Sequence, residues 1–264
     1  MNTPARSAKH SLKAGKKLVL GWCSIPSPVT AELVARAGFD AIAVDLQHGL
    51  IDYGTALSML QVIDATPRPT FCRVPSGDLA AIGKALDAGF SGIICPLVNT
   101  REEAEAIVRA ARYAPLGERS FGPTRANLVH GTGYFQDSSN LVTVAAMIET
   151  AEAIANLDEI LAVDGLDAVY VGPSDLALSL GHTPVLEPIL PEVAREITRI
   201  RVSAQHRGKF AGIHCGSVEG IGRWLEEGFD FATLSTDVRL MSAWLATATA
   251  QIGALPAVRE SRLR

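Results

Sequence analysis

Four segments of the 264-residue chain repeat one plan, and this repeat restricts the possible folds more than any other feature. In each segment a helix-like stretch reaches a glycine, and an apolar, strand-like run begins one or two residues later. Glycine suits the left-handed position that ends a helix, so each segment predicts a helix-to-strand junction. The segments are ARAGFDAIAVD (35–45), LDAGFSGIICP (86–96), VDGLDAVYVGP (163–173) and LEEGFDFATLS (225–235). Such repetition indicates alternating helices and parallel strands.

The rest of the chain completes this alternation. Nearly continuous apolar runs, typical of parallel strands covered on both faces, occupy 18–23, 41–46, 70–74, 92–98, 143–149, 168–172, 210–215 and 231–235. Helical patterns occupy 29–37, 54–65, 77–88, 101–112, 151–163, 190–207, 217–227 and 238–250. Eight strands and eight helices over about 230 residues predict an α/β fold of the (β/α)₈ barrel type. An open doubly wound sheet usually has fewer strands and a glycine-rich first turn, which GWCSIPSP lacks.

The chain is expected to form one barrel domain over residues 18–252, with a basic flexible tail at 1–17 and a second tail at 253–264. A secretory signal is a poor alternative for the first tail, because the apolar run that follows is short and contains prolines. The segment 114–142 has several glycines and no clear periodicity, so a long loop of the kind that often carries function is expected there.

Composition excludes several classes of protein. The net charge of −4 gives no reason to expect a nucleic-acid partner, and no apolar run is long enough for a membrane helix. The cysteines Cys23, Cys72, Cys95 and Cys215 are scattered in apolar runs without a CxxC pair. This pattern argues against a zinc site or a disulfide framework and predicts reduced thiols in a cytoplasmic protein.

Polar residues follow several predicted strands at the ends where a (β/α)₈ barrel places its catalytic side chains. The candidates are His48, Arg73, Glu149, Ser174 and Asp175. Each alone could be a helix cap, a first-turn acid or an ion-pair partner. Their joint occurrence at the ends of four strands favours a functional site. His214 and Asp237, at the ends of the last two strands, are expected to be structural.

The chemistry of these residue types fits a divalent metal. Two carboxylates with open positions for water and substrate suit a hard cation such as Mg²⁺ or Mn²⁺, with Co²⁺ as a further option. Such a metal can chelate a 2-oxo acid, an arginine can stabilise the enolate, and a histidine can move the proton.

Two other chemistries are disfavoured: a Schiff base on a lysine, and the isomerisation of a phosphorylated substrate. A Schiff base needs a buried strand lysine, and only Lys209 is near a strand, at its non-catalytic end. A phosphate isomerase would need glycine-rich loops after the last two strands, and only HCGSVEG is a partial match.

Six sequence blocks resemble the HpcH/HpaI aldolase and citrate lyase family, which includes metal-dependent pyruvate aldolases. They are DLQHG, CRVP, PLVNTREEAEAIVRAARYAPLGERSFG, IET, LDEILAVDGLDAVYVGPSDLALSLG and GFDFATLSTDV, and the similarity runs from about residue 21 to 252. The resemblance implies a barrel of the phosphoenolpyruvate/pyruvate-domain type. It also implies exchange of the last helix between subunits and a homo-oligomer, a hexamer or a trimer.

The resemblance also implies catalytic roles. His48 matches the catalytic base, and Asp87 matches the aspartate that pairs with this histidine. Arg73 matches the arginine that binds the pyruvate carbonyl and stabilises the enolate.

Metal and substrate contacts follow in the same way. Glu149 and Asp175 match the metal ligands, and Ser174 matches a position whose backbone N–H contacts the pyruvate carboxylate. Two residues depart from the family pattern: Gln47 replaces a frequent Glu, and Met147 replaces a frequent substrate-contacting Gln. Met147 shares a strand face with Glu149, so its thioether is expected to affect which substrate binds.

The sequence therefore predicts an aldolase that cleaves a 4-hydroxy-2-oxo acid to pyruvate, or hydroxypyruvate, and an aldehyde. One alternative is a lyase acting on a CoA thioester, but no basic cluster is evident for the CoA phosphates. Another is a catalytically silent homologue that binds a 2-oxo acid, which the complete set of polar residues argues against.

Overall fold

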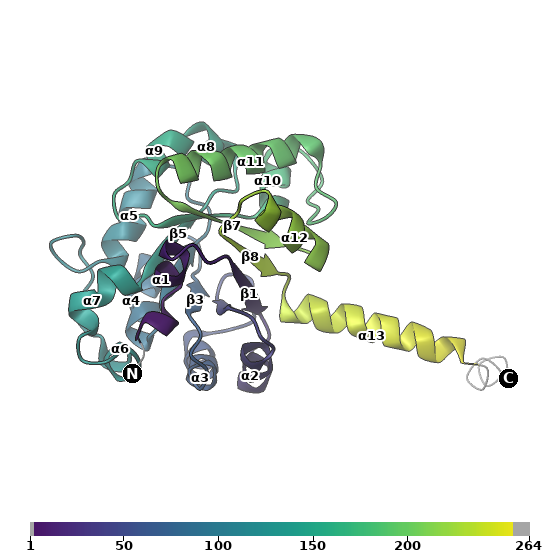
Figure 1. Ribbon diagram of the computed structural model, residues 1–264, viewed down its shortest axis with the longest axis horizontal. Coiled ribbons are helices and arrows are strands. Elements are labelled where there is room, and N and C mark those ends of the chain that lie inside the picture. Colours follow the sequence, from purple (N-terminus) through teal and green to yellow (C-terminus); the bar gives the residue numbers. More distant parts are fainter. Residues whose placement is uncertain (1–2, 256–264) are drawn as a thin grey trace.

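The computed structural model describes residues 3–255, and its centre is a closed barrel of eight parallel strands (Figure 1). The strands are β1 (Leu18–Cys23), β2 (Ala41–Asp45), β3 (Thr70–Arg73), β4 (Gly92–Cys95), β5 (Thr143–Met147), β6 (Ala168–Val171), β7 (Phe210–Cys215) and β8 (Phe231–Leu234). Each strand pairs with the next along the chain, and β8 pairs with β1. The predicted (β/α)₈ barrel is confirmed.

Helices surround the barrel. They are η1 (Thr3–Arg6), α1 (Ala8–Lys13), α2 (Pro28–Arg36), α3 (Tyr53–Ile63), α4 (Leu79–Ala88), α5 (Arg101–Ala111), α6 (Thr124–His130), α7 (Tyr134–Leu141), α8 (Ala151–Ala155), α9 (Leu157–Leu161), α10 (Pro173–Ser179), α11 (Pro191–His206), α12 (Val218–Glu226) and α13 (Asp237–Ala254). The expected loop 114–142 contains two of them, α6 and α7. The helix expected at 151–163 is divided at Asn156, whose side chain donates to the Asn99 carbonyl at 2.9 Å.

An aromatic layer fills the inside of the barrel. Trp22 stacks on Tyr170 with ring centroids 5.9 Å apart, and Tyr170 lies 5.9 Å from Phe231. Glycine at 212 makes room for this layer, because a Cβ there would lie 2.1 Å from the Phe231 ring. The layer fills the barrel beneath the C-terminal ends of the strands.

The N-terminal segment differs from the expected flexible tail. Residues 8–13 form α1, which is capped by the Ser7 hydroxyl and places Leu12 in the apolar interior cluster of the barrel with only 4 % of its surface exposed. The Lys9 ammonium lies 2.6 Å from the Asp167 carboxylate, just before β6 begins. Because these contacts lie at the N-terminal ends of the strands, α1 closes the end of the barrel opposite to the C-terminal ends of the strands.

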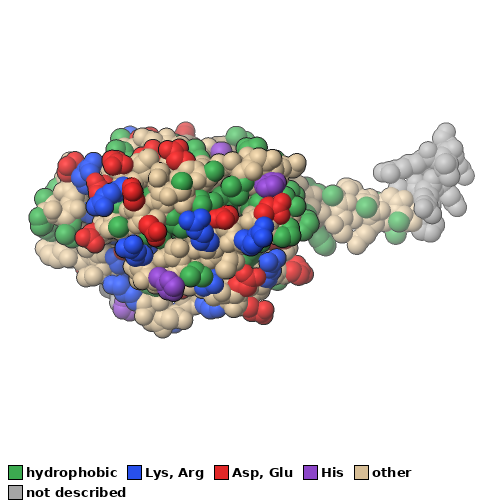
Figure 2. Space-filling model, turned by 90° about the horizontal axis from the view of Figure 1, so that it is seen from above, with side chains coloured by type: hydrophobic (Ala, Val, Ile, Leu, Met, Phe, Trp, Pro, Cys, Tyr) green, Lys and Arg blue, Asp and Glu red, His purple; other side chains and the backbone are tan. Residues whose placement is uncertain are grey.

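The last helix leaves the barrel. Both α13 and its direction are visible in Figures 1 and 2, where it extends away from the rest of the protein. Its apolar side chains Met241, Trp244 and Leu245 are exposed. An exchange of this helix between subunits would cover them, and that exchange remains a prediction. The expected C-terminal tail falls largely on residues 256–264, outside the described residues.

No helix within residues 3–255 is long and apolar enough to cross a membrane. On the face seen in Figure 2, basic and acidic side chains are intermixed.

We expect Leu12→Ala to lower the free energy of unfolding by about 2–3 kcal/mol, because it leaves a cavity in the buried end of the barrel. Lys13→Ala, at an exposed neighbour on the same helix, is the control and should change it little. Urea unfolding of both variants measures the difference. Equal stability of Leu12→Ala and the parent chain would mean that α1 does not close the barrel.

Candidate active site

A cleft at the C-terminal ends of the strands collects most of the residues predicted from the sequence. About 540 Å³ of empty space is lined by His48, Arg73, Met147, Tyr170, Gly172, Pro173, Ser174, Asp175, Leu186, His214, Thr236 and Arg239. Glu149 is buried directly beside this lining, since a Cβ on Gly172 would lie 2.4 Å from its Oε2. The barrel therefore brings the strand-end residues together at one mouth.

A buried ion pair organises one side of the cleft. The strand register places Asp45 opposite Arg73. Arg73 donates from Nε to Asp45 Oδ1 at 2.8 Å and from Nη2 to Oδ2 at 2.5 Å. Burial opposes ionisation of Asp45, but the hydrogen bonds and charge of Arg73 prevail and lower its pKa below the usual value. The pair is therefore charged, and its planar, two-bonded geometry fixes the guanidinium.

The same carboxylate fixes the start of the next loop. Asp45 Oδ1 accepts hydrogen bonds from the backbone N–H groups of Gln47 at 3.0 Å and His48 at 3.3 Å. Gly49 completes this turn, because a Cβ at that position would lie 2.2 Å from the Asp45 carbonyl oxygen. The loop that carries His48 is thus held by the residue that holds Arg73.

Trp22 supports the ion pair from below. The Arg73 guanidinium lies 4.9 Å from the centre of the Trp22 ring, and the indole N–H donates to Asp45 at 3.3 Å. The sequence reasoning missed Trp22. Its position at an inward-facing site near the end of β1 was the available signal.

Glu149, beside the lining of the cleft, is a buried carboxylate with an incomplete set of hydrogen bonds. It is 2 % exposed, and its Oε1 accepts a hydrogen bond from the Leu97 N–H at 2.9 Å. Its Oε2 is buried and has no hydrogen-bond partner among the described residues. Burial raises the pKa of Glu149 to about 7, and the nearby charge of Asp175 adds to the shift. An ionised carboxylate here needs a cation to complete its coordination.

The residues fit a divalent metal ion. Asp175, exposed in the first turn of α10, and the unpartnered oxygen of Glu149 could supply two hard oxygen ligands. Residues 3–255 contain no group of three or more His, Cys, Asp or Glu side chains suited to a metal. A cation held by only two carboxylates keeps open positions for water and substrate oxygens.

Asp87 does not pair with His48 within one chain, contrary to expectation. It lies in the last turn of α4, which carries the chain back toward the opposite end of the barrel. Its carboxylate instead accepts from Arg119 Nη2 at 2.6 Å. The His48 side chain makes no hydrogen bond with any residue in the described range. The position of Asp87 just before the helix-ending Gly89 was a sequence signal that it lay far from the strand ends.

Of the two residues at the ends of the last two strands, Asp237 agrees with expectation and His214 differs from it. Asp237 is structural as predicted, since its carboxylate accepts from the backbone N–H groups of Ser24 at 2.8 Å and Ile25 at 3.2 Å. His214, also expected to be structural, lines the cleft, and its Nδ1 lies 3.0 Å from the Tyr170 hydroxyl.

The partial phosphate-binding match after β7 is filled from within the chain. Glu187 Oε1 accepts a hydrogen bond from the Gly216 N–H at 3.0 Å. A carboxylate that already occupies this position disfavours a phosphate there.

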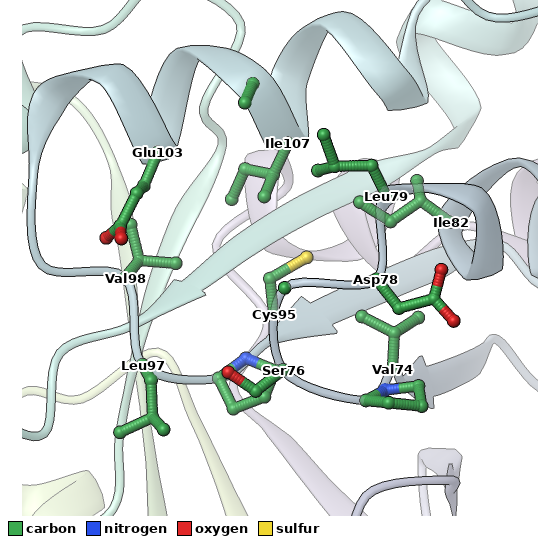
Figure 3. A pocket seen from close by; sticks show the side chains of 14 residues that line it. Val74, Ser76, Asp78, Leu79, Ile82, Cys95, Leu97, Val98, Glu103 and Ile107 are labelled. Atoms are coloured by element: carbon green, nitrogen blue, oxygen red, sulfur yellow. The ribbon is translucent and has the colours of Figure 1, made fainter.

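A second pocket lies between α4 and α5 (Figure 3). Its two acidic side chains are engaged as helix caps: Asp78 accepts from the Ala81 N–H at 3.0 Å, and Glu103 accepts from the Asn99 N–H at 2.6 Å. Leu97, on its rim in Figure 3, is the residue that donates to Glu149. The pocket therefore touches the site through Leu97, and both of its carboxylates are already engaged within the chain.

The chain is similar to several known proteins. The sequence model described as HpcH/HpaI aldolase/citrate lyase matches residues 18–243. The chain is 45% identical over 229 residues to a hydroxypyruvate/pyruvate aldolase of Rhizorhabdus wittichii, covering 87% of this chain and 91% of that protein. It is 34% identical over 251 residues to a 4-hydroxy-2-oxo-heptane-1,7-dioate aldolase of Escherichia coli, covering 94% and 95%. The crystal structure of an HpcH/HpaI aldolase from Desulfitobacterium hafniense superposes with a TM-score of 0.87 at 29% identity, covering 95% of this chain and 98% of that one.

The raised pKa of Glu149 predicts how the stability of the metal-free protein changes with pH. A carboxyl group whose pKa is raised to about 7 on folding favours the folded state at acid pH, where it is protonated, and this stabilisation is lost as the pH rises through about 7. In a chelator at pH 8.5, Glu149→Gln should therefore be about 2 kcal/mol more stable than the parent chain. The difference should vanish near pH 4.

Urea unfolding at the two pH values measures this difference. Glu226→Gln, at an exposed glutamate, is the control and should show no such pH dependence. If Glu149→Gln is no more stable than the parent chain at pH 8.5, the ionised Glu149 carboxylate does not destabilise the folded protein.

Proposed function

The chain belongs to the HpcH/HpaI aldolase/citrate lyase family, and we propose that it is a divalent-metal-dependent aldolase. It reversibly cleaves a 4-hydroxy-2-oxo acid to pyruvate, or hydroxypyruvate, and an aldehyde. The observation that carries this proposal is the buried Glu149 oxygen without a partner, close to the charge of Asp175 and directly beside the lining of the cleft that contains Arg73 and His48. This arrangement suits an acid that presents both a carboxylate and a keto oxygen.

Glu149 and Asp175 would hold the metal. When bound, Mg²⁺, Mn²⁺ or Co²⁺ supplies Lewis acidity toward the oxygens of the 2-oxo acid. The backbone N–H of Ser174, which lines the cleft next to Asp175, would receive the carboxylate of the substrate.

Arg73 would stabilise the charge that develops in the reaction. Its Nε and one Nη2 hydrogen are used by Asp45, which leaves its remaining N–H groups for the substrate C2 oxygen. Because Asp45 and Trp22 fix the guanidinium before substrate binds, little reorganisation is needed when that oxygen becomes an enolate.

His48 would be the proton-transfer group. In the cleavage direction it takes the proton of the C4 hydroxyl, and the C3–C4 bond breaks as the C4 carbonyl forms. The electron pair of that bond becomes the C2–C3 double bond of the enolate, and a proton delivered to C3 then gives pyruvate.

Asp87 would act on His48 only between copies of the chain. Within one chain its carboxylate belongs to Arg119, so the expected pairing requires Asp87 of a second copy. This requirement accords with the homo-oligomer, hexamer or trimer, that we propose together with exchange of α13.

Other features bear on substrate and location. Met147, 2 % exposed, would place a thioether against the donor half of the substrate. The relative named for both hydroxypyruvate and pyruvate supports either acid as the donor. All four cysteines are buried and free, which accords with the cytoplasmic location that we propose.

Metal removal tests the proposal. We expect the EDTA-treated protein to release no pyruvate from a panel of 4-hydroxy-2-oxo acids, and Mg²⁺ or Mn²⁺ to restore the release. Addition of the metal should also raise the melting temperature of the parent chain but not of a variant with both Glu149→Gln and Asp175→Asn. Full activity in the chelated protein would exclude the metal from the reaction.

Substitution of the base is the second test. His48→Ala should lower kcat by about 100-fold or more, because general-base catalysis is lost. His10→Ala, at an exposed histidine outside the barrel mouth, is the matched control. Pyruvate formation at saturating substrate measures both variants, and a wild-type rate in His48→Ala would refute the assignment.

A further inference from the structure

Three polar side chains on neighbouring strands form a hydrogen-bonded chain beneath the cleft, and the proposed reaction uses none of them. The Tyr170 hydroxyl on β6 lies 2.8 Å from Thr233 Oγ1 on β8 and 3.0 Å from His214 Nδ1 on β7. Tyr170 and Thr233 are fully buried, whereas His214 is partly exposed in the cleft. Only the histidine can therefore reach a substrate.

The hydrogens of this chain can be placed by counting them. If the Tyr170 hydroxyl donates to Thr233, the Thr233 hydrogen has no acceptor among the hydrogen bonds of residues 3–255. If Thr233 donates to Tyr170 and Tyr170 donates to His214 Nδ1, every hydroxyl hydrogen has an acceptor. A buried hydroxyl left unpaired is costly, so the second arrangement is favoured. His214 then carries its own hydrogen on Nε2.

Burial and the neighbouring positive charges keep His214 neutral. Burial, and then the positive charge of Arg73, lower its pKa to about 3. Arg239, on the first turn of α13, lowers it further, whereas Asp45 opposes the shift. Burial also raises the pKa of the Tyr170 hydroxyl, so that this group stays protonated and able to donate.

The Nε2 atom faces the open cleft. Its ring stands edge-on to Trp22 with centroids 5.1 Å apart, and Nδ1 is occupied by Tyr170. Nε2 is not among the buried polar atoms without a partner, and no described residue bonds to it. Arg239 lines the same side of the cleft, is exposed, and forms no ion pair with any described carboxylate.

We propose that His214 determines aldehyde specificity: its Nε2–H donates to an oxygen on the aldehyde-derived half of the substrate, and Arg239 favours a carboxylate there. This inference rests on the aldolase function proposed above. Arg73, Glu149, Ser174 and Asp175 would engage the 2-oxo acid half, which leaves the side of the cleft formed by His214 and Arg239 for the other half. Tyr170 and Thr233 are positioning residues that fix the tautomer of His214.

The test compares three aldehydes with pyruvate as the common donor. Glyoxylate carries a carboxylate, glycolaldehyde carries a hydroxyl, and propanal carries neither. In His214→Leu, the ratio of kcat/KM for glyoxylate to that for propanal should fall about 10-fold or more, because one hydrogen bond to a charged group is lost. His214→Gln, which keeps an N–H donor, should recover part of the ratio. His206→Leu, at an exposed histidine, is the control.

Arg239→Gln separates carboxylate from hydroxyl recognition. It should raise KM for glyoxylate and leave the ratio of glycolaldehyde to propanal unchanged. An unchanged KM for glyoxylate would overturn the preference for a carboxylate.

The tautomer of His214 is tested by NMR, with a kinetic measurement on a Tyr170 variant beside it. In the ¹⁵N NMR spectrum of the parent protein, His214 should be neutral with its hydrogen on Nε2, and Tyr170→Phe should alter that signature and lower the glyoxylate-to-propanal ratio through KM rather than kcat. A hydrogen on Nδ1 in the parent protein would refute the inference.

The two proposals fail in different ways. No turnover of any aldehyde by the metal-loaded parent protein would refute the aldolase function. Turnover by the parent protein, with the same glyoxylate-to-propanal ratio in His214→Leu, would refute the role of His214 alone.

Discussion

The buried pair of Asp45 and Arg73 is the contact on which the rest of the cleft depends. The register of β2 against β3 places the two residues opposite each other, and Asp45 is 1 % exposed. One carboxylate thereby orients the guanidinium, the indole N–H of Trp22 and the backbone of His48. Removing either charge would leave the other without its oppositely charged partner, which is destabilising at a site this buried. The proposed enolate-binding group and the proposed base are thus placed by one anchor.

Glu149 shows the opposite strategy. Gly172 allows its carboxylate to be buried, yet only one of its oxygens has a hydrogen-bond partner among the described residues. A buried carboxylate with one unpaired oxygen destabilises the metal-free protein, and a bound cation would remove this destabilisation. Conflict between stability and local chemistry is typical of functional sites. Arg73 is therefore already held by hydrogen bonds to Asp45 before substrate binds. One oxygen of Glu149, in contrast, has no hydrogen-bond partner among the described residues.

Much of the barrel could be predicted because its signals are local. A glycine before an apolar run marks four of the helix-to-strand junctions, and strand ends mark the mouth, so His48, Arg73 and Asp175 could be placed from the sequence. Asp87 was assigned from the resemblance alone, and its place near the end of α4 was overlooked. Leu12 was missed because the lysines around it resemble a solvated tail, and its burial depends on the open end of a barrel formed by distant strands. Contacts across three strands, such as that of Tyr170 on β6 with Thr233 on β8, have no local pattern.

The central claim is that this cleft forms the enolate of pyruvate with the help of a metal and Arg73. Proton exchange at the methyl group of pyruvate tests it directly, because exchange requires the enolate but no aldehyde. In D₂O with Mg²⁺, the ¹H NMR signal of the methyl group should disappear at a rate that rises with the amount of protein added. EDTA should stop this exchange, and Arg73→Lys should slow it. Exchange that continues unchanged in EDTA, or its absence in a protein that catalyses the aldol reaction, would contradict the account.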